Sequence, residues 1–135
     1  MKFISKSEKE TFEFAKDFAG KLDKGTIIFL DGEMGSGKTA FAKGLLSGLG
    51  YKGEVTSPTF ALCHIYNLGI PILHYDLYRI QDCDDIYSTG FFEDCGKDNI
   101  TIVEWSGIAK EYFPEAIQIK FEYGSTPEER IITIE

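Results

Sequence analysis

Residues 32–39 read Gly-Glu-Met-Gly-Ser-Gly-Lys-Thr, which satisfies the phosphate-binding pattern G-x-x-x-x-G-K-[ST] at every specified position. The flanking sequence has the elements that this pattern requires. Thr26–Leu30 is a short apolar run, which predicts a strand buried on both faces. After the loop, apolar residues recur at helical spacing up to Leu49, and Gly48 and Gly50 predict the end of that helix. We therefore expect a strand, a phosphate-binding loop and a helix in succession; the alternative is an ordinary glycine-rich corner.

The chemistry of phosphate binding explains each residue type in this loop. Glycines let backbone N–H groups turn inward around phosphate oxygens, and the start of the following helix adds its positive dipole end. Lys38 is expected to reach the β- and γ-phosphates, and the Thr39 hydroxyl to ligate Mg²⁺. The expected nucleotide contacts in the loop are Gly35, Ser36, Gly37, Lys38, Thr39 and Ala40.

Length and charge limit the remaining possibilities. The 135 residues suit one domain, 1–135, with a sizeable core. A net charge of −8 argues against this chain gripping a phosphate backbone by itself, so we expect any tRNA or other nucleic-acid role to run through a partner. No apolar run approaches the ~20 residues of a membrane span, and the chain start lacks a signal-peptide core. These features predict a soluble, cytoplasmic protein without a membrane partner. Cys63, Cys83 and Cys95 form no C-x-x-C pair, which favours free thiols.

Before the loop, Ser7 followed by Glu10 is a capping-box pattern that predicts a helix reaching Asp23. After it, the composition predicts strands at 60–67 and 72–76 around a turn at Leu68–Pro71, which together make a hairpin. Further along, we expect a short helix at 82–90, a buried strand at 99–104, a short helix at 108–112, and two antiparallel strands at 116–123 and 131–134.

Two carboxylates end predicted core strands. Asp76 closes the run that begins at Ile72, and Glu104 closes the run that begins at Ile100. Ligands of open α/β sheets bind beyond the carboxyl ends of strands, and a phosphate loop holds Mg²⁺ well only with such an additional carboxylate. Either acid alone is more often a solvated strand end. Beside a complete phosphate loop, we expect both to serve the metal.

The turn from Thr56 to Phe60 has three hydroxyls, those of Thr56, Ser57 and Thr59, around the rigid residue Pro58. These hydroxyls are placed to sense a γ-phosphate as switch segments do, or they satisfy one another within a proline turn.

The chain has only two arginines, Arg79 and Arg130, and each is either a phosphate or partner contact or the partner of a surface acid. His64 and His74 are expected to be hydrogen-bonded structural residues rather than metal ligands. Trp105 is expected in the core, with a lid over the nucleotide as the alternative.

Four segments, taken in this order and spacing, resemble the bacterial TsaE (YjeE) family, and the resemblance covers nearly the whole chain. They are Gly32–Thr39, Thr56–Phe60, His74–Arg79 and Ile102–Trp105. The phosphate loop alone occurs in many ATPases and GTPases, whereas the combination of four motifs is specific. Glu33 and Met34 stand where the family usually has aspartate and leucine, and Cys63-His64 is also less typical.

The resemblance implies a single-domain P-loop NTPase fold of the α/β class, with a mixed parallel and antiparallel sheet flanked by helices. It also implies an ATPase that uses ATP and Mg²⁺ and is required for the threonylcarbamoyladenosine modification of tRNAs that read codons starting with A. The family acts with the proteins TsaB and TsaD, while other subunits make and transfer the threonylcarbamoyl group.

Carried over by motif, the resemblance makes Lys38, Asp76 and Glu104 the expected catalytic residues and Thr39, Asp76 and Glu104 the expected metal ligands. Arg130 stands where the family's last strand pair has an arginine near the nucleotide. The segment Thr56-Ser57-Pro58-Thr59 and Trp105 resemble switch-like parts, and Arg79 is a candidate partner contact.

Three functions are consistent with these residues. The first is a switch ATPase, slow by itself because no arginine lies within the loop, whose ATP cycle resets a tRNA-modifying complex. The second is a small-metabolite or nucleoside kinase, because phosphate loops serve both classes; two arginines are few for such an enzyme. The third is a nucleotide-regulated binding module without catalysis.

Overall fold

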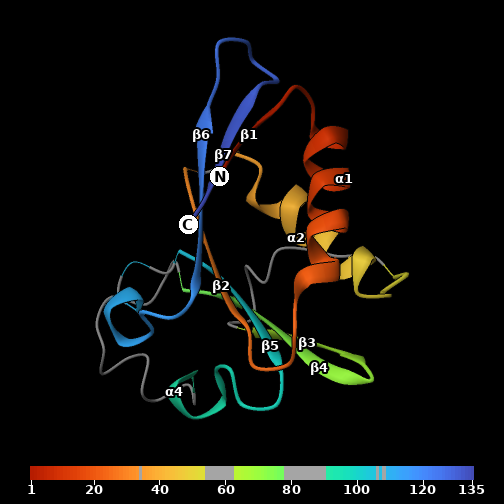
Figure 1. Ribbon diagram of the computed structural model, residues 1–135, viewed down its shortest axis with the longest axis vertical. Helices are drawn as coiled ribbons and strands as arrows, with labels where there is room; N and C mark the ends of the chain where they lie inside the picture. The colour runs from red at the N-terminus through yellow and green to blue at the C-terminus, as the bar shows by residue number, and fades with distance from the viewer. Residues whose placement is uncertain (34, 54–62, 78–90, 106, 108) are drawn as a thin grey trace.

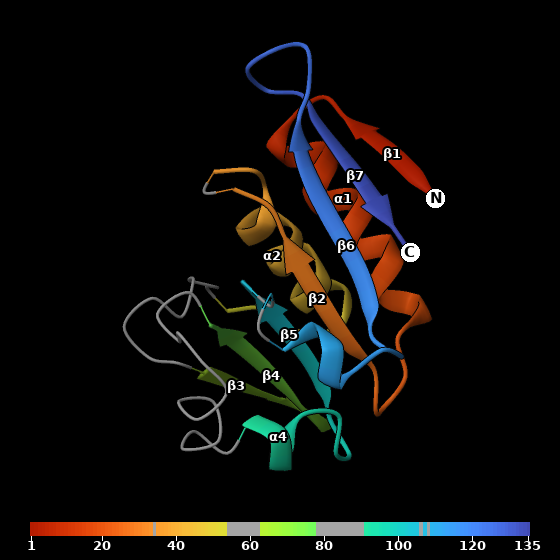
Figure 2. The ribbon, with the colours of Figure 1, turned by 90° about the vertical axis from the view of Figure 1, so that its left-hand side faces the viewer.

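The computed structural model describes residues 1–33, 35–53, 63–77, 91–105, 107 and 109–135. Within these residues, seven strands form one sheet in the order β1–β7–β6–β2–β5–β4–β3 (Figure 2). The strands are β1 Lys2–Ser5, β2 Ile27–Asp31, β3 Cys63–Leu68, β4 Ile70–Asp76, β5 Ile100–Glu104, β6 Ile117–Tyr123 and β7 Arg130–Ile134. β2 pairs in parallel with β5 and β6, and β5 with β4, while the β1–β7, β6–β7 and β3–β4 pairs are antiparallel. The expected mixed α/β sheet is confirmed.

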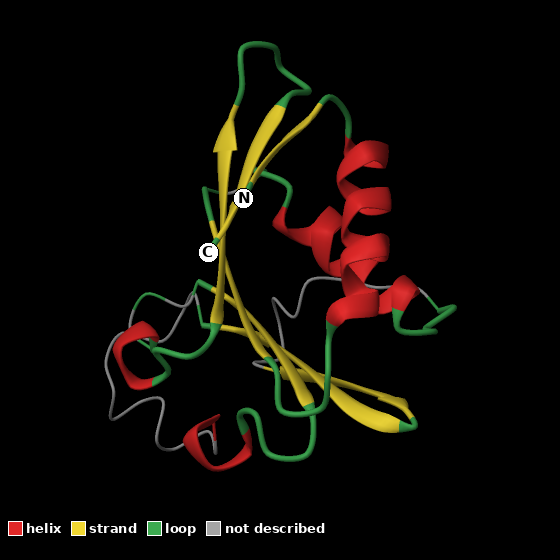
Figure 3. Ribbon diagram, in the orientation of Figure 1, coloured by secondary structure: helices red, strands yellow, loops and turns green. Residues whose placement is uncertain are grey.

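Helices cover both faces of this sheet (Figures 1 and 3). The longer helices α1 Glu8–Phe18 and α2 Lys38–Gly48 pack on one face, and α4 Phe91–Asp94 and the 3₁₀ helix Lys110–Tyr112 lie on the other. The first four residues of the central strand β2 are apolar because both faces of the strand are buried there. Ile28 and Leu30 belong to the core beneath α1 and α2, and Phe29 belongs to the core of the opposite face. A parallel strand buried on both faces has no solvent side for polar residues.

The local signals of the sequence are confirmed where they concern helix ends and turns. The backbone N–H of Glu10 donates to the Ser7 hydroxyl at 3.1 Å, so Ser7 caps α1 as the capping box predicts. In the β3–β4 hairpin the turn is tighter than expected. Gly69 alone makes it, with φ of 93°, and Pro71 lies inside β4 instead of in the turn. A single residue in the left-handed region suffices to reverse the chain there, which leaves Pro71 extended opposite Asn67.

Strand β1 was not expected from the sequence. Its four residues are too few to show a clear alternation, and its pairing partner β7 lies at the far end of the chain. Phe3 packs on the core beneath α1, where its ring stacks on that of Phe14 with centroids 4.2 Å apart.

Cys63 and Cys95 are free thiols, and burial raises the pKa of Cys95 to about 12.

Several expectations fall on residues that the structure does not describe. The hydroxyl-rich turn with Thr56, Ser57, Pro58 and Thr59 lies outside the described residues, as do Arg79, Cys83 and the helix expected at 82–90. Of the helices that are described, none is both long and apolar enough to cross a membrane.

Helices α1 and α2 touch backbone to backbone through two glycines of α2. A Cβ at Gly44 would lie 2.3 Å from the carbonyl oxygen of Phe12, and one at Gly48 would lie 2.4 Å from that of Lys16. Gly48 was expected only as a helix stop, and it is the last residue of α2. The contact shows that its main role is packing, while Gly50, with φ of 106°, turns the chain away.

This contact predicts that Gly44→Ala destabilises the protein. The Phe12 carbonyl belongs to helix backbone and cannot rotate away, so the helices must separate. We expect the free energy of unfolding, measured by urea denaturation, to fall by about 1–3 kcal/mol in spite of alanine's better helix propensity. The matched control is Gly20→Ala, whose Cβ meets nothing within 4 Å and which should unfold at the wild-type urea concentration or slightly above. Equal stability of Gly44→Ala and wild type would contradict the close contact.

Candidate functional site

The loop between β2 and α2 has the backbone shape of an anion cradle. Gly35 and Gly37 have φ of 78° and 107°, which side chains rarely adopt, and Gly37 is the residue from which α2 starts. Gly32 is needed for space instead. A Cβ there would lie 2.6 Å from the Ser36 hydroxyl oxygen and 2.9 Å from the carbonyl oxygen of Phe121. Each of these three glycines therefore has a geometric requirement that no other residue meets.

The donors of this loop fit a phosphate group. The Ser36 hydroxyl is buried, and it finds no hydrogen-bond partner in the described part of the chain. The N-cap residue of α2 is Gly37, which has no side chain to cap the helix, and the first N–H groups of α2 lie at the positive end of the helix dipole. A buried donor without a partner is costly in a folded protein, and an oxygen-rich anion at this place would satisfy it. These donors are therefore suited to binding the phosphates of a nucleotide.

Lys38 is the charged group of the loop. Its Nζ donates to the carbonyl oxygen of Gly32 at 2.7 Å and lies 3.3 Å from the centre of the Trp105 ring. Burial lowers the pKa of the Lys38 amine, while the negative charges of Glu104, Asp76 and Asp31 act in the opposite direction. The amine therefore lies between the loop backbone and an aromatic face, within electrostatic range of three carboxylates.

Trp105 is not in the core, contrary to the expectation from sequence. It is half-buried, and its backbone adopts the left-handed conformation with φ of 58°. For a bulky residue this conformation costs about 1–3 kcal/mol and persists only where the surroundings enforce it. The chain turns sharply after β5, and this turn lays the indole face over the Lys38 amine as a cation–π contact.

Three carboxylates end neighbouring parallel strands at this edge of the sheet: Asp31 on β2, Glu104 on β5 and Asp76 on β4. Asp76 is paired with Glu104 in the strand register, and both point to the face that α2 covers. Asp31 follows Leu30 and points to the opposite face, where its carboxylate pairs with Lys110 at 2.6 Å. The sequence reasoning missed Asp31, although it ends its strand in the same way as the two carboxylates that were identified.

Asp76, Glu104 and the Thr39 hydroxyl offer the oxygen ligands that Mg²⁺ prefers. Among the described residues, no group of three or more His, Cys, Asp or Glu side chains forms a closed metal cage. Mg²⁺ needs none, since it usually takes one or two carboxylates and completes its shell with water and substrate phosphates. These residues therefore fit a magnesium ion shared with a nucleotide.

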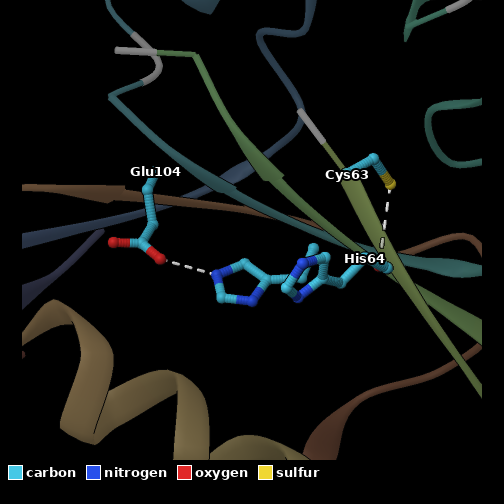
Figure 4. A network of polar contacts seen from close by, with 4 residues as sticks. Cys63, His64 and Glu104 are labelled. Carbon is cyan, nitrogen blue, oxygen red and sulfur yellow. Dashed lines mark hydrogen bonds and ion pairs between the residues drawn. The ribbon is translucent and has the colours of Figure 1, made fainter. Parts of the chain in front are cut away.

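Glu104 has a further partner. One oxygen of its carboxylate lies 2.6 Å from Nε2 of His74, and the other points away from this contact (Figure 4). Both side chains are almost fully buried. The expectation of a hydrogen-bonded structural histidine is confirmed for His74. His64 lies opposite it on β3, with its ring 6.4 Å from that of Tyr66, and its carbonyl accepts a hydrogen bond from the Cys63 thiol (Figure 4).

Arg130 reaches the loop from the start of β7. Its Nη2 donates to the carbonyl oxygen of Gly35 at 3.2 Å, and its Nη1 donates to the carbonyls of Pro127 and Glu129. The guanidinium lies 4.7 Å from the centre of the Tyr123 ring. The structure thus brings Arg130 beside the phosphate loop, although 95 positions of the chain separate it from Gly35.

A groove of about 1160 Å³ opens beside the loop, and Trp105 forms part of its lining. It begins at Asp31 and Gly32 and runs over the outer face of β6 and β7, where Lys120 and Glu122 line it. No helix of the described residues covers this part of the sheet (Figure 2). The loop therefore borders two different regions. One is this exposed groove, and the other is the pair of carboxylates on the face of the sheet that α2 covers.

The unpartnered Ser36 hydroxyl predicts that Ser36→Ala stabilises the protein. Alanine removes a buried donor with little change in shape, and we expect the free energy of unfolding without nucleotide to rise by about 1 kcal/mol. The control is Ser5→Ala, because the Ser5 hydroxyl is equally buried but is bonded to the Ser7 carbonyl and the Thr11 hydroxyl at 2.7 Å. That variant should lose stability. If both variants lose stability in urea denaturation, Ser36 has a partner in the folded protein.

Comparison with known proteins shows which family the chain belongs to. Residues 5–132 match the family model described as threonylcarbamoyl adenosine biosynthesis protein TsaE. Curated relatives named tRNA threonylcarbamoyladenosine biosynthesis protein TsaE include those of Rickettsia typhi, 40% identical over 86% of this chain and 82% of its own, and Haemophilus influenzae, 36% identical over 86% and 78%. A crystal structure of Bacillus subtilis YdiB superposes with a TM-score of 0.83 and 30% identity, covering 99% of this chain and 83% of that one. The chain belongs to the TsaE family of threonylcarbamoyladenosine biosynthesis proteins.

Proposed function

We propose that this protein is a Mg²⁺-dependent ATPase whose ATP cycle switches a tRNA-modifying complex that contains TsaB and TsaD. One observation is its main support: Asp76 and Glu104 end adjacent strands in register, and their charges act on the Lys38 amine of a loop whose buried Ser36 hydroxyl has no hydrogen-bond partner among the described residues. A loop that binds phosphates only as an anchor has no need of carboxylates at the same place, because they repel phosphate. Carboxylates beside phosphates serve a metal ion or a water molecule.

In this proposal the residues divide the work by their chemistry. The loop N–H groups and Ser36 bind phosphate oxygens, and Lys38 leaves the Gly32 carbonyl to neutralise charge on the β- and γ-phosphates. Thr39 and Glu104 would hold Mg²⁺, which would supply positive charge to neutralise the phosphates. Asp76 supports the metal or orients a water molecule, which attacks the γ-phosphorus in line as the bond to ADP breaks.

Turnover by the isolated chain is expected to be slow. Transition-state charge in phosphoryl transfer is commonly neutralised by an arginine, often one supplied by a partner protein. Arg130 is beside the loop, but its guanidinium is engaged with the carbonyls of Gly35, Pro127 and Glu129. A partner that draws Arg130 from these carbonyls, or adds its own cation, completes the site. The groove beside Trp105 gives such a partner access to the loop.

Hydrolysis is tested by measuring phosphate release with Mg²⁺-ATP, with and without TsaB and TsaD. We expect stimulation by the partners, and we expect Lys38→Ala and Glu104→Gln each to lower the rate at least about a hundredfold, as removal of a charge-stabilising group does in other enzymes. The control is Lys43→Ala, which removes a lysine of the same helix, and it should keep the wild-type rate.

The products separate the competing functions. Free phosphate and ADP support the switch ATPase, whereas a phosphorylated metabolite or nucleoside would establish a kinase. Tight ATP binding without any product, even with TsaB and TsaD present, would leave only a nucleotide-regulated binding module. Full activity of both site variants would place the chemistry elsewhere in the molecule.

Trp105, the chain's sole tryptophan, should report binding directly. A phosphate that takes the Lys38 amine must draw it from the indole face, where it now lies 3.3 Å from the ring centre. We expect intrinsic fluorescence to change on addition of ATP in the wild-type protein and to stay constant in Lys38→Ala. An unchanged wild-type signal, at ATP concentrations that saturate binding measured by calorimetry, would show that the Lys38–Trp105 contact survives in the complex.

A further inference from the structure

The buried pair of His74 and Glu104 has a geometry that packing alone does not require. Nε2 of His74 lies 2.6 Å from Oε2 of Glu104, and the two side chains are 0% and 3% exposed. Apolar residues surround the pair on the same face, including Ile72 and Ile102 on the same two strands. Replacing both polar residues by apolar ones would fill this space without any desolvation cost. This comparison indicates that the His74–Glu104 pair has a functional role, which offsets the desolvation cost of burying two polar side chains.

Strand register explains how the two side chains meet. β4 and β5 run in parallel with Asp76 opposite Glu104 and His74 opposite Ile102. His74 is thus one pleat before the strand ends, and its ring extends diagonally toward the carboxylate that closes β5. A carboxylate only accepts hydrogen bonds, so Nε2 has the hydrogen and donates it. The other ring nitrogen, Nδ1, is buried and has no hydrogen-bond partner among the described residues.

The hydrogen bond with His74 engages one oxygen of the Glu104 carboxylate and leaves the other available to bind a ligand. A glutamate at a strand end has three rotatable bonds, and the histidine restricts them by holding Oε2. The other oxygen points away from the imidazole (Figure 4), and the Glu104 charge acts on the Lys38 amine at the mouth of the phosphate loop. Hydrogen-bonded partners of this kind fix the orientation of metal-binding side chains, and their loss typically weakens metal binding by about 10–100-fold.

We propose that His74 is the positioning residue of this site: its Nε2–H fixes the Glu104 carboxylate so that the remaining oxygen faces the magnesium of a bound nucleotide. This inference rests on the proposed function, because it takes Glu104 as a metal ligand. His74 touches neither nucleotide nor metal and acts only through Glu104.

The test measures metal binding without turnover. Mn²⁺ replaces Mg²⁺ as a paramagnetic probe, and its affinity for the intact protein is measured by electron paramagnetic resonance with a saturating non-hydrolysable ATP analogue. We expect His74→Leu to weaken Mn²⁺ binding by about tenfold or more. His74→Gln, which places an amide N–H near the position of Nε2, should restore most of the affinity. Binding of the analogue in EDTA should be the same in all variants.

The matched control is His64→Leu. His64 lies directly opposite His74 on the neighbouring strand, and its ring packs near Tyr66. This variant should bind Mn²⁺ as wild type does. Wild-type affinity in His74→Leu would overturn the proposal, and so would equal defects in His74→Leu and His74→Gln, which would indicate packing alone. If the wild-type protein itself binds no Mn²⁺ with the analogue, the proposed function fails, and the role of His74 fails with it.

A measurement on the unmodified protein decides the question if His74→Leu does not fold. Imidazole ¹⁵N resonances, assigned by comparison with His64→Leu, report which ring nitrogen has the hydrogen. We expect the Nε2–H form of His74, and we expect its Nε2 signal to shift when Mg²⁺ is added to the protein–analogue complex. A His74 signal that does not respond to Mg²⁺, while the analogue stays bound, would overturn the proposal.

Discussion

The parallel pairing of β2, β5 and β4 is the constraint on which the rest of this molecule depends. It aligns the carboxyl ends of three strands, so that Asp31, Glu104 and Asp76 end at one edge and the phosphate loop leaves from the same edge. Burial on both faces makes this register firm, because a slip of one residue would exchange the two cores. The position of the site thus follows from the same apolar side chains that stabilise the sheet.

Polar groups at this edge are held at a cost to stability. Ser36 and His74 each have a buried polar atom without a partner among the described residues, and Trp105 adopts a strained backbone conformation. Lys38 is buried enough that its amine pKa falls despite three neighbouring carboxylates. Such features cluster where a protein binds something, since the ligand supplies the missing partners. Here they lie within one loop and the two strand ends that face it.

Sequence reasoning succeeded where the signal is local. The succession of a strand, a glycine-containing loop and α2, the Ser7 cap of α1, and the apolar strand that ends at Glu104 each depend on a few consecutive residues. It failed where the answer depends on which segments meet. Strand β1 exists because β7 pairs with it, and the His74–Glu104 bond joins residues thirty positions apart. Trp105 was expected in the core because an aromatic residue beside a buried strand usually packs there; its backbone turn was not visible in the sequence.

The glycine contact between α1 and α2 has a consequence for how the molecule transmits a signal. Because the backbones of the two helices touch at Gly44 and Gly48, α2 cannot slide or roll against α1 without a clash. The helix that starts at the phosphate loop is therefore held in place against α1. If the ATP cycle proposed above moves an element beside the loop, this contact leaves Trp105 and the groove that it lines as the place for the movement. The molecule thus differs on the two sides of the loop, with helix backbones in contact on one side and a side-chain contact beside an open groove on the other.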